Sequence, residues 1–151
     1  MVTFAVFMSK ITVTKFTFGE PELQEAFSIR RKVFVDEQHC PPELEYQNDD
    51  VSTHFLAKYN GIPCGAARWR KTENGIKLER FAVLPEYRGK GIGAELLKAV
   101  LNDIPSGTGK VYLNSQVSAI DFYLPFGFRP VGDRFEEAGI MHQQMLYADH
   151  S

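Results

Sequence analysis

Hydrophobic and polar residues alternate along several short stretches of the first half of the chain, and this two-residue period predicts β-strands. Asn60-Gly61 and Asn74-Gly75 are strong signals for tight hairpin turns, and each is flanked by such stretches. The strands that we predict here are residues 10–18, 53–59, 62–71 and 76–83. Because tight turns join the last three of these strands, we expect them to be antiparallel.

Two longer stretches place apolar residues three and four positions apart, which is the period of an amphipathic helix. The first begins at Pro21, a residue suited to the start of a helix, and runs to about Val35. The second carries its apolar face from Ile92 to Ile104. Later elements are a strand at 111–113, a helix at 119–124 and strands at 127–131 and 139–147. This order indicates an α+β fold with one central mixed sheet.

Two local features qualify this outline. Residues 36–50 are irregular and contain six acids but no Lys or Arg. Such a run is usually a solvated surface, although it would also suit an acidic rim that recruits a cationic amine. Arg30 lies on the apolar face of the preceding helix, so it must pair with an acid, point at an anion or extend its stem to solvent. Ser118 and Asp121 have the spacing of a capping box for the short helix.

The bulk composition predicts one domain over residues 1–151. A net charge of -2 argues against a nucleic-acid or membrane-surface partner, and no apolar run approaches the roughly 18 residues of a membrane span. Cys40 and Cys64 form neither a disulfide framework nor a metal site, so we expect free thiols, no metal and a cytoplasmic location. We interpret residues 1–9 as a frayed extension or edge strand and not as a signal peptide.

The stretch with the clearest chemistry is the strand, glycine-rich loop and helix between residues 76 and 104. Gly89, Gly91 and Gly93 let the backbone approach a ligand, and a helix N-terminus attracts an anion, so the stretch resembles a phosphate cradle. A P-loop is excluded because no lysine followed by Ser or Thr closes the loop. A dinucleotide fingerprint stays open, since Ala94 completes G-x-G-x-x-A. Against it, the preceding strands are antiparallel and the next predicted strand does not end in an acid.

The third reading of the cradle is the pyrophosphate of coenzyme A. Residues 88–93 (RGKGIG) match the Gln/Arg-x-x-Gly-x-Gly/Ala pattern of the GNAT acyltransferase superfamily, and 83–87 match its usual lead-in. Residues 121–128 resemble its "FY…GF" segment, whereas 33–38 and 139–142 resemble the small bacterial ElaA/YjcF-like branch. The resemblance covers nearly the whole chain. It implies an acyl-CoA N-acyltransferase fold, whose central sheet is mixed but mostly antiparallel, splayed at the cofactor site and flanked by helices.

The same resemblance implies a set of site residues. Acetyl-CoA would be held by the strand before the loop, by the loop and by the next strand, and a backbone N–H near Phe81 would stabilise the oxyanion. The implied cofactor-binding residues are Phe81, Ala82, Val83, Arg88, Gly89, Lys90, Gly91, Ile92, Gly93, Asn114 and Ser118. Arg30, Glu37 and His142 are the implied substrate-binding residues.

Acyl transfer to an amine also needs an acid and a base. Tyr123 matches the residue that protonates the leaving thiolate, and we favour this role over the alternative, a core tyrosine whose hydroxyl is satisfied elsewhere. Glu79 is our candidate base because it shares a strand face with Phe81, with a salt-bridged glutamate as the alternative. Further candidate bases are Glu37, His39, His54 and His142.

We therefore expect an acetyl-CoA-dependent N-acetyltransferase that acts directly on a primary amine of a small molecule or peptide. The alternatives are a non-catalytic acyl-CoA sensor on the same fold and, less in keeping with the strand order, a dinucleotide oxidoreductase. A homodimer through the C-terminal strands is a family-level expectation.

Overall fold

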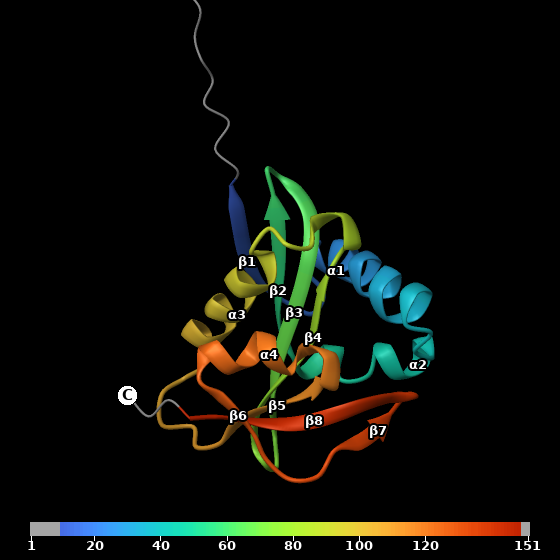
Figure 1. Cartoon of the computed structure of the whole chain (residues 1–151). Coiled ribbons are helices and arrows are strands. Elements are labelled where there is room, and N and C mark those ends of the chain that lie inside the picture. The colour runs from blue at the N-terminus through green and yellow to red at the C-terminus, as the bar shows by residue number, and fades with distance from the viewer. Residues whose placement is uncertain (1–9, 149–151) are drawn as a thin grey trace, which may run out of the picture.

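A mixed β-sheet lies at the centre of the computed structural model, which describes residues 10–148 (Figure 1). Its eight strands within these residues follow the order β1-β2-β3-β4-β5-β8-β6, and β7 pairs with β8. Only β4 and β5 are parallel; the other described pairs are antiparallel. The strands are β1 Ile11–Thr17, β2 Thr53–Tyr59, β3 Ile62–Thr72, β4 Gly75–Val83, β5 Val111–Gln116, β6 Phe128–Pro130, β7 Phe135–Glu137 and β8 Ile140–Tyr147. The expected mixed, mostly antiparallel sheet is confirmed.

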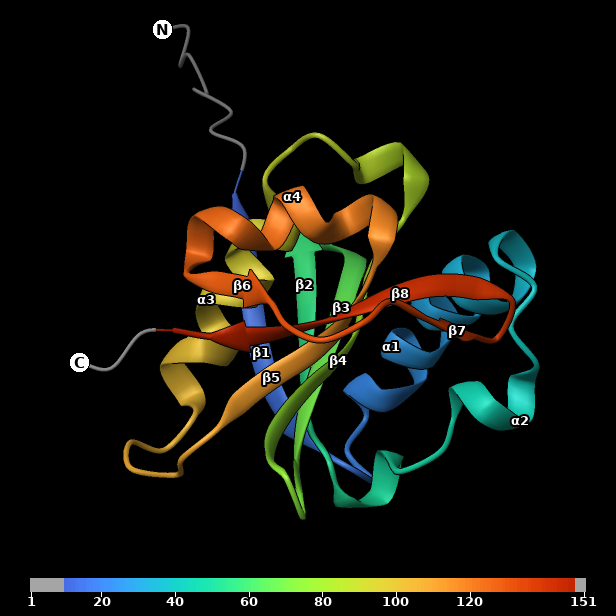
Figure 2. The same ribbon diagram turned by 60° about the horizontal axis from the view of Figure 1, so that its bottom comes forward.

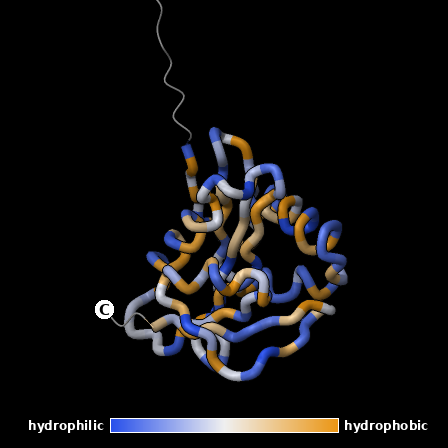
Figure 3. Tube along the Cα trace, in the orientation of Figure 1, coloured by the Kyte–Doolittle hydropathy of each residue, from blue (hydrophilic) through white to orange (hydrophobic). Residues whose placement is uncertain are grey.

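Helices cover both faces of this sheet (Figures 1 and 2). One core packs α3 against β2, β3 and β4, with Leu96 and Leu97 fully buried; the other packs α1 against the opposite face through Leu23 and Ile29. Hydrophobic and hydrophilic residues are interspersed along α3, as expected for a helix with one apolar face (Figure 3). The helices are α1 Glu22–Arg30, α2 Pro42–Glu45, α3 Ile92–Asp103 and α4 Ile120–Tyr123.

The first predicted helix changes its winding halfway. After α1 the chain continues as a π-helix, Arg31–Glu37, in which the Gln38 N–H donates to the Val33 carbonyl at 3.1 Å. Such wide turns are rare in proteins overall, and those that occur are often found at functional sites. The π-helix ends at Glu37, whose carboxylate lies 2.8 Å from the guanidinium of Arg88 in the glycine loop.

Several local predictions were wrong. Residues 36–50 are not all irregular, because they contain α2 and a short 3₁₀ turn, Asp49–Val51. The capping box fails, because α4 starts after Ala119 and has no side-chain cap. Strand β7 was not predicted, because its sequence Phe-Glu-Glu lacks an alternating apolar pattern. The interpretation of residues 1–9 lies outside the described residues.

Candidate active site

The sheet opens between its two parallel strands. β4 and β5 are paired only at Ile76–Val111, Lys77–Tyr112 and Leu78–Leu113. A bulge follows on β4, where the pairing with β3 shifts register and Arg80 has a φ of 60°. Beyond it the two strands diverge, and β8 crosses the other strands at a steep angle (Figure 2). The splay that the family resemblance implies is therefore present.

A cavity of about 530 Å³ lies in this opening. Its walls come from the end of β4, the end of β5, the π-helix, α4 and the β7–β8 hairpin. A second cavity of about 450 Å³ lies at the N-terminus of α3 and is lined by the glycine loop. Val83, Arg88, Gly93 and Phe122 line both cavities, so the two are neighbours. An elongated ligand could therefore run from the helix terminus into the sheet.

The glycine loop is shaped by backbone conformation. Gly89 and Gly91 have φ values of 81° and 85°, a region that side chains with a Cβ rarely adopt. Gly91 is the N-cap of α3 and supplies no side-chain cap, which leaves the first N–H groups of the helix open to an anion. A Cβ at either position would meet no protein atom within 4 Å, so the space beside the loop is open, as the expected phosphate requires. The φ angle is the reason for glycine that the structure shows.

Replacing Gly91 with alanine should strain the loop by about 1–2 kcal/mol and weaken coenzyme A binding about tenfold. Gly19→Ala is the matched control, since Gly19 has a φ of 96° and equally open surroundings but lies far along the chain from the loop. Calorimetric titration with coenzyme A measures both variants. Equal loss of affinity in the two variants would contradict a local role for the loop.

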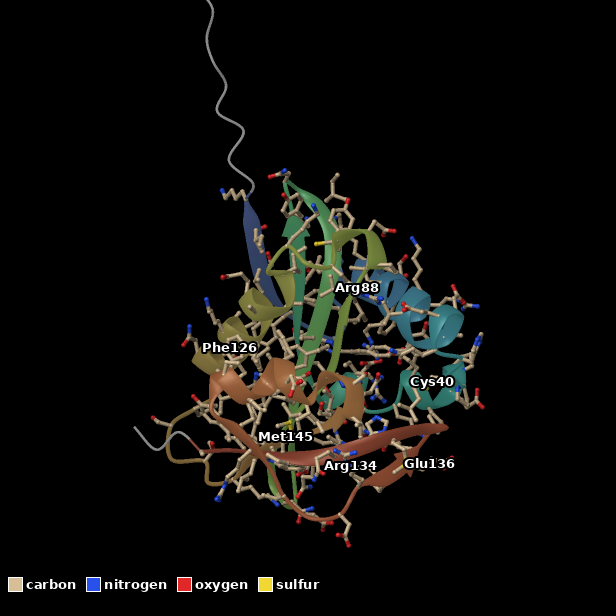
Figure 4. The ribbon with its side chains drawn as sticks, viewed as in Figure 1. Cys40, Arg88, Phe126, Arg134, Glu136 and Met145 are labelled. Carbon is tan, nitrogen blue, oxygen red and sulfur yellow. The ribbon has the colours of Figure 1, made fainter. Side chains whose placement is uncertain are left out.

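Arg88 and Glu37 tie the loop to the π-helix. The Arg88 guanidinium donates to both Glu37 carboxylate oxygens at 2.8 and 2.9 Å and to the Val83 carbonyl at 3.0 Å. These bonds lower the pKa of Glu37, although its burial opposes them. Figure 4 labels Arg88 near the top of β4, on the side of α1. Glu37 lines neither cavity, so its predicted contact with substrate is not supported.

Arg30 is a structural residue and not a substrate ligand. It is 1% exposed, donates to Glu45 and Asp49 at 2.7 Å each, and lines neither cavity. Arg68 binds the same Asp49 oxygen. Glu45 and Asp49 belong to the acidic segment 36–50, which we expected at the surface, yet both are buried. The assignment of Arg30 to the substrate is wrong, because its partners are protein carboxylates.

Glu79 lines the cavity but is a poor base. Burial by itself would raise its pKa, but a hydrogen bond from Arg70 and the charges of Arg68 and Lys77 outweigh burial and lower the pKa to about 2. The nitrogens of these residues approach its carboxylate at 2.7, 3.0 and 3.1 Å. A carboxylate held this firmly accepts a proton only from a strong acid. We therefore withdraw Glu79 as the general base and accept the salt-bridged alternative.

Tyr123 faces the cavity from α4. Its ring packs edge-on against Phe81 at 6.2 Å, and the residue is 8% exposed. Within residues 10–148 its hydroxyl has no hydrogen-bond partner. Burial raises the pKa of Tyr123, so the hydroxyl stays protonated near neutral pH and remains a donor. The structure thus provides an unoccupied donor beside the splayed strand.

The remaining predicted residues divide into two groups. Phe81, Ala82, Val83 and Asn114 line the main cavity, as His142 does. The Asn114 Oδ1 is buried and has no partner in the described chain. In the second group, Ser118 lines neither cavity, the Lys90 ammonium lies over the Tyr59 ring at 5.3 Å, and Ile92 is a core residue that also borders the loop cavity.

One feature of the cavity has no signal in the sequence. The Gln116 amide donates to the Gln38 oxygen at 2.8 Å and joins β5 to the end of the π-helix across the opening. The two residues are 78 positions apart, and glutamine has no helical or strand pattern that would pair them.

Within residues 10–148, two kinds of feature are absent. No group of three His, Cys, Asp or Glu side chains in this part of the chain is arranged to hold a metal ion. None of its helices is long and apolar enough to cross a membrane.

Known proteins resemble this chain both in sequence and in fold. The profile of the acetyltransferase (GNAT) domain family matches residues 18–148. The uncharacterized N-acetyltransferase YjcF of Bacillus subtilis is 37% identical over 131 residues, which cover 85% of this chain and 94% of YjcF. The crystal structure of Escherichia coli ElaA superimposes with a TM-score of 0.77 at 28% identity, covering 89% of this chain and 98% of ElaA.

A more distant structure shows the fold alone. It is a GNAT family acetyltransferase from Elizabethkingia anophelis with acetyl-CoA bound, with a TM-score of 0.64 at 22% identity over 90% of this chain and 94% of that one. The sequence matches show more than a shared fold, because they are long and similar enough to establish the family. The chain therefore belongs to the GNAT acetyltransferase family, whose members transfer acetyl groups from acetyl-CoA, and resembles its ElaA/YjcF-like branch.

Proposed function

We propose that this protein transfers an acetyl group from acetyl-CoA directly to a primary amine of a small molecule or peptide. The observation that carries the proposal is the pair of neighbouring cavities, one at an open helix N-terminus and one in the splayed sheet, with the Tyr123 hydroxyl in the second. The first suits the pyrophosphate of coenzyme A and the second its pantetheine arm and thioester.

The residues present fit this cosubstrate. Backbone groups of Phe81–Val83 face an opening where β5 no longer pairs with them, and a ligand with amide groups can occupy such positions. A buried acceptor without a donor costs about 1–3 kcal/mol, so the lone Asn114 Oδ1 also favours an amide ligand. Acetyl-CoA supplies the activated thioester; the chain binds it and stabilises charge.

Two groups are proposed to act on the reacting atoms. A backbone N–H near Phe81 stabilises the negative charge that develops on the carbonyl oxygen. The Tyr123 hydroxyl donates a hydrogen bond, and then a proton, toward the leaving sulfur, because it has no protein partner to satisfy in the described chain.

Direct transfer is favoured over a covalent enzyme intermediate. Cys64 is fully buried, and its thiol lies 3.6 Å from the Ala57 carbonyl. Burial raises the pKa of both Cys64 and Cys40, which disfavours the thiolate that a cysteine nucleophile requires. Free thiols also agree with the cytoplasm as the place of action.

An amine panel tests the proposal. Thiol release from acetyl-CoA should rise well above background hydrolysis with at least one class of primary amine. A non-catalytic acyl-CoA sensor would instead bind acetyl-CoA without acetylating any amine, and the bound acetyl-CoA would raise the Tm of the protein. Stabilisation by NAD(H) but not by acetyl-CoA would overturn the proposal in favour of a dinucleotide enzyme. The homodimer stays a prediction, which light scattering of the full chain measures.

A further inference from the structure

We propose that His142 is the general base that deprotonates the acceptor ammonium, with Glu137 as its positioning residue. This assignment rests on the proposed amine acetylation and replaces the substrate-binding role that the family resemblance implied for His142. It begins from the placement of one imidazole in the wall of the main cavity.

The hydrogen bond at one ring nitrogen determines what the other can do. The Nδ1 atom of His142 lies 2.7 Å from the Ile140 carbonyl oxygen. Because a carbonyl can only accept, Nδ1 carries the hydrogen, and the neutral ring keeps its lone pair on Nε2. The ring also stacks on Phe135, with centroids 5.8 Å apart. His142 is 8% exposed, so its orientation is fixed by packing as well.

Three other titratable groups lie beside the ring or across the cavity from it. The Glu137 carboxylate lies 3.8 Å from Nε2, and its side chain is 55% exposed. Across the cavity, the segment after the π-helix contributes the Cys40 thiol and β4 contributes Arg80. Arg80 is already bound to the Leu44 and Glu45 carbonyls at 3.1 Å each. Glu137 is therefore the charge that touches the imidazole most directly.

The sheet register places the His142 side chain among residues that line the main cavity. His142 pairs with Gln116 across β5 and β8, and side chains at paired positions share a face. Asn114 lies two residues from Gln116 and shares that face as well. Tyr123 and Phe81 approach from the side of α4, where they pack together. These five residues all line the main cavity, so a thioester carbonyl held beside Phe81 would share the cavity with the proposed acid and the proposed base.

Three other ionisable groups that line the cavity, Glu79, Glu45 and Cys40, are less suited to this role. Glu79 has a pKa of about 2. Burial raises the pKa of Glu45, which would favour a base, but the carboxylate is 1% exposed and Arg30 binds its Oε1 at 2.7 Å. The Cys40 thiol is kept protonated by burial. His142 has a free lone pair and a nearby carboxylate.

The proton transfer itself is balanced. The Nε2 lone pair forms an N–H bond while an N–H bond of the ammonium breaks, and the amine keeps the electron pair with which it attacks the carbonyl carbon. The imidazolium then lies beside the Glu137 carboxylate until its proton leaves to solvent, which reaches that exposed side chain.

His142→Gln is the main test, with His39→Asn as control. His39 is exposed, lines neither cavity and has a φ of 61°, which asparagine tolerates. Near neutral pH, His142→Gln should lower kcat/KM about 10²-fold, and the deficit should shrink at high pH because more amine is already unprotonated. Coenzyme A affinity, measured by calorimetry, should stay within about twofold of wild type in both variants.

Two further measurements separate a base from a structural residue. Glu137→Gln should lower kcat/KM and leave coenzyme A affinity unchanged, because the imidazolium that forms during the reaction loses a nearby negative charge. Added imidazole should restore part of the activity of His142→Ala, which has room for it.

The outcomes distinguish the assignment from the proposed function. A His142→Gln protein with the wild-type pH profile would overturn the assignment while leaving acetylation intact. Loss of coenzyme A binding together with a lowered Tm in that variant would also overturn it, since the role would then be structural. If the wild-type protein acetylates no amine, the proposed function fails and the assignment with it.

Discussion

Replacing Tyr123 with phenylalanine should lower kcat by about 10²–10³-fold and leave coenzyme A affinity nearly unchanged. The change removes only the hydroxyl, which has no partner in the described chain and lines the main cavity. The ring contacts with Phe81 and Phe128 remain, so packing should be preserved. Burst and steady-state measurements of thiol release give kcat, and calorimetry gives the affinity.

Tyr112→Phe is the matched control for this experiment. Tyr112 is also a buried tyrosine, but its hydroxyl bonds the Thr72 hydroxyl at 2.7 Å, and the residue lines neither cavity. Its variant should lose about 1 kcal/mol of stability and no kcat. An unchanged kcat in Tyr123→Phe would remove the proposed acid and leave oxyanion stabilisation as the chemical contribution of the site.

Replacing Arg30 with methionine should lower the free energy of unfolding by about 3–5 kcal/mol. Methionine fills similar space but leaves the Glu45 and Asp49 carboxylates buried, at 1% and 3% exposure, with fewer cations to pair with them. Arg68 still contacts Asp49, and Arg80 still lies 3.7 Å from Glu45, so the loss should lie at the lower end of this range. Urea denaturation followed by circular dichroism measures it.

Lys98→Met provides the comparison. Its partner Glu95 lies 3.5 Å away on α3, and both side chains are about half exposed. Such surface pairs contribute about 0–1 kcal/mol. If both variants lose the same small amount, the buried cluster contributes no more than a surface pair, and the structural role given to Arg30 is incorrect.

The elements whose signal is local were predictable from the sequence. β2 was predicted residue for residue, and α3 differs by one residue at its end, because alternation and helical period are properties of neighbouring residues. The glycine loop was also predictable, because the positive φ angles at Gly89 and Gly91 strongly favour glycine at these positions.

What failed depends on partners that are distant in the chain. Arg30 was assigned to a substrate because its true partners could not be identified from the sequence. Glu45 and Asp49 lie 15 and 19 residues away, in an acidic segment that we expected to be exposed to solvent. Glu79 lies on the face opposite Phe81, because the bulge at Arg80 interrupts the alternation along β4. The sequence also does not show that Arg68 and Arg70 of β3 converge on Glu79. Charge type is visible in a sequence, whereas charge pairing is created by the fold.

The central claim is acetyl transfer from acetyl-CoA to an amine in the opening between β4 and β5. The most direct measurement is mass spectrometry of an amine mixture after incubation of the full chain with acetyl-CoA that carries a deuterated acetyl group. We predict that one class of primary amine gains the labelled acetyl group as an amide, in proportion to the thiol released. Acetyl-CoA that binds but is not consumed, or thiol release without any labelled amide, would contradict the claim.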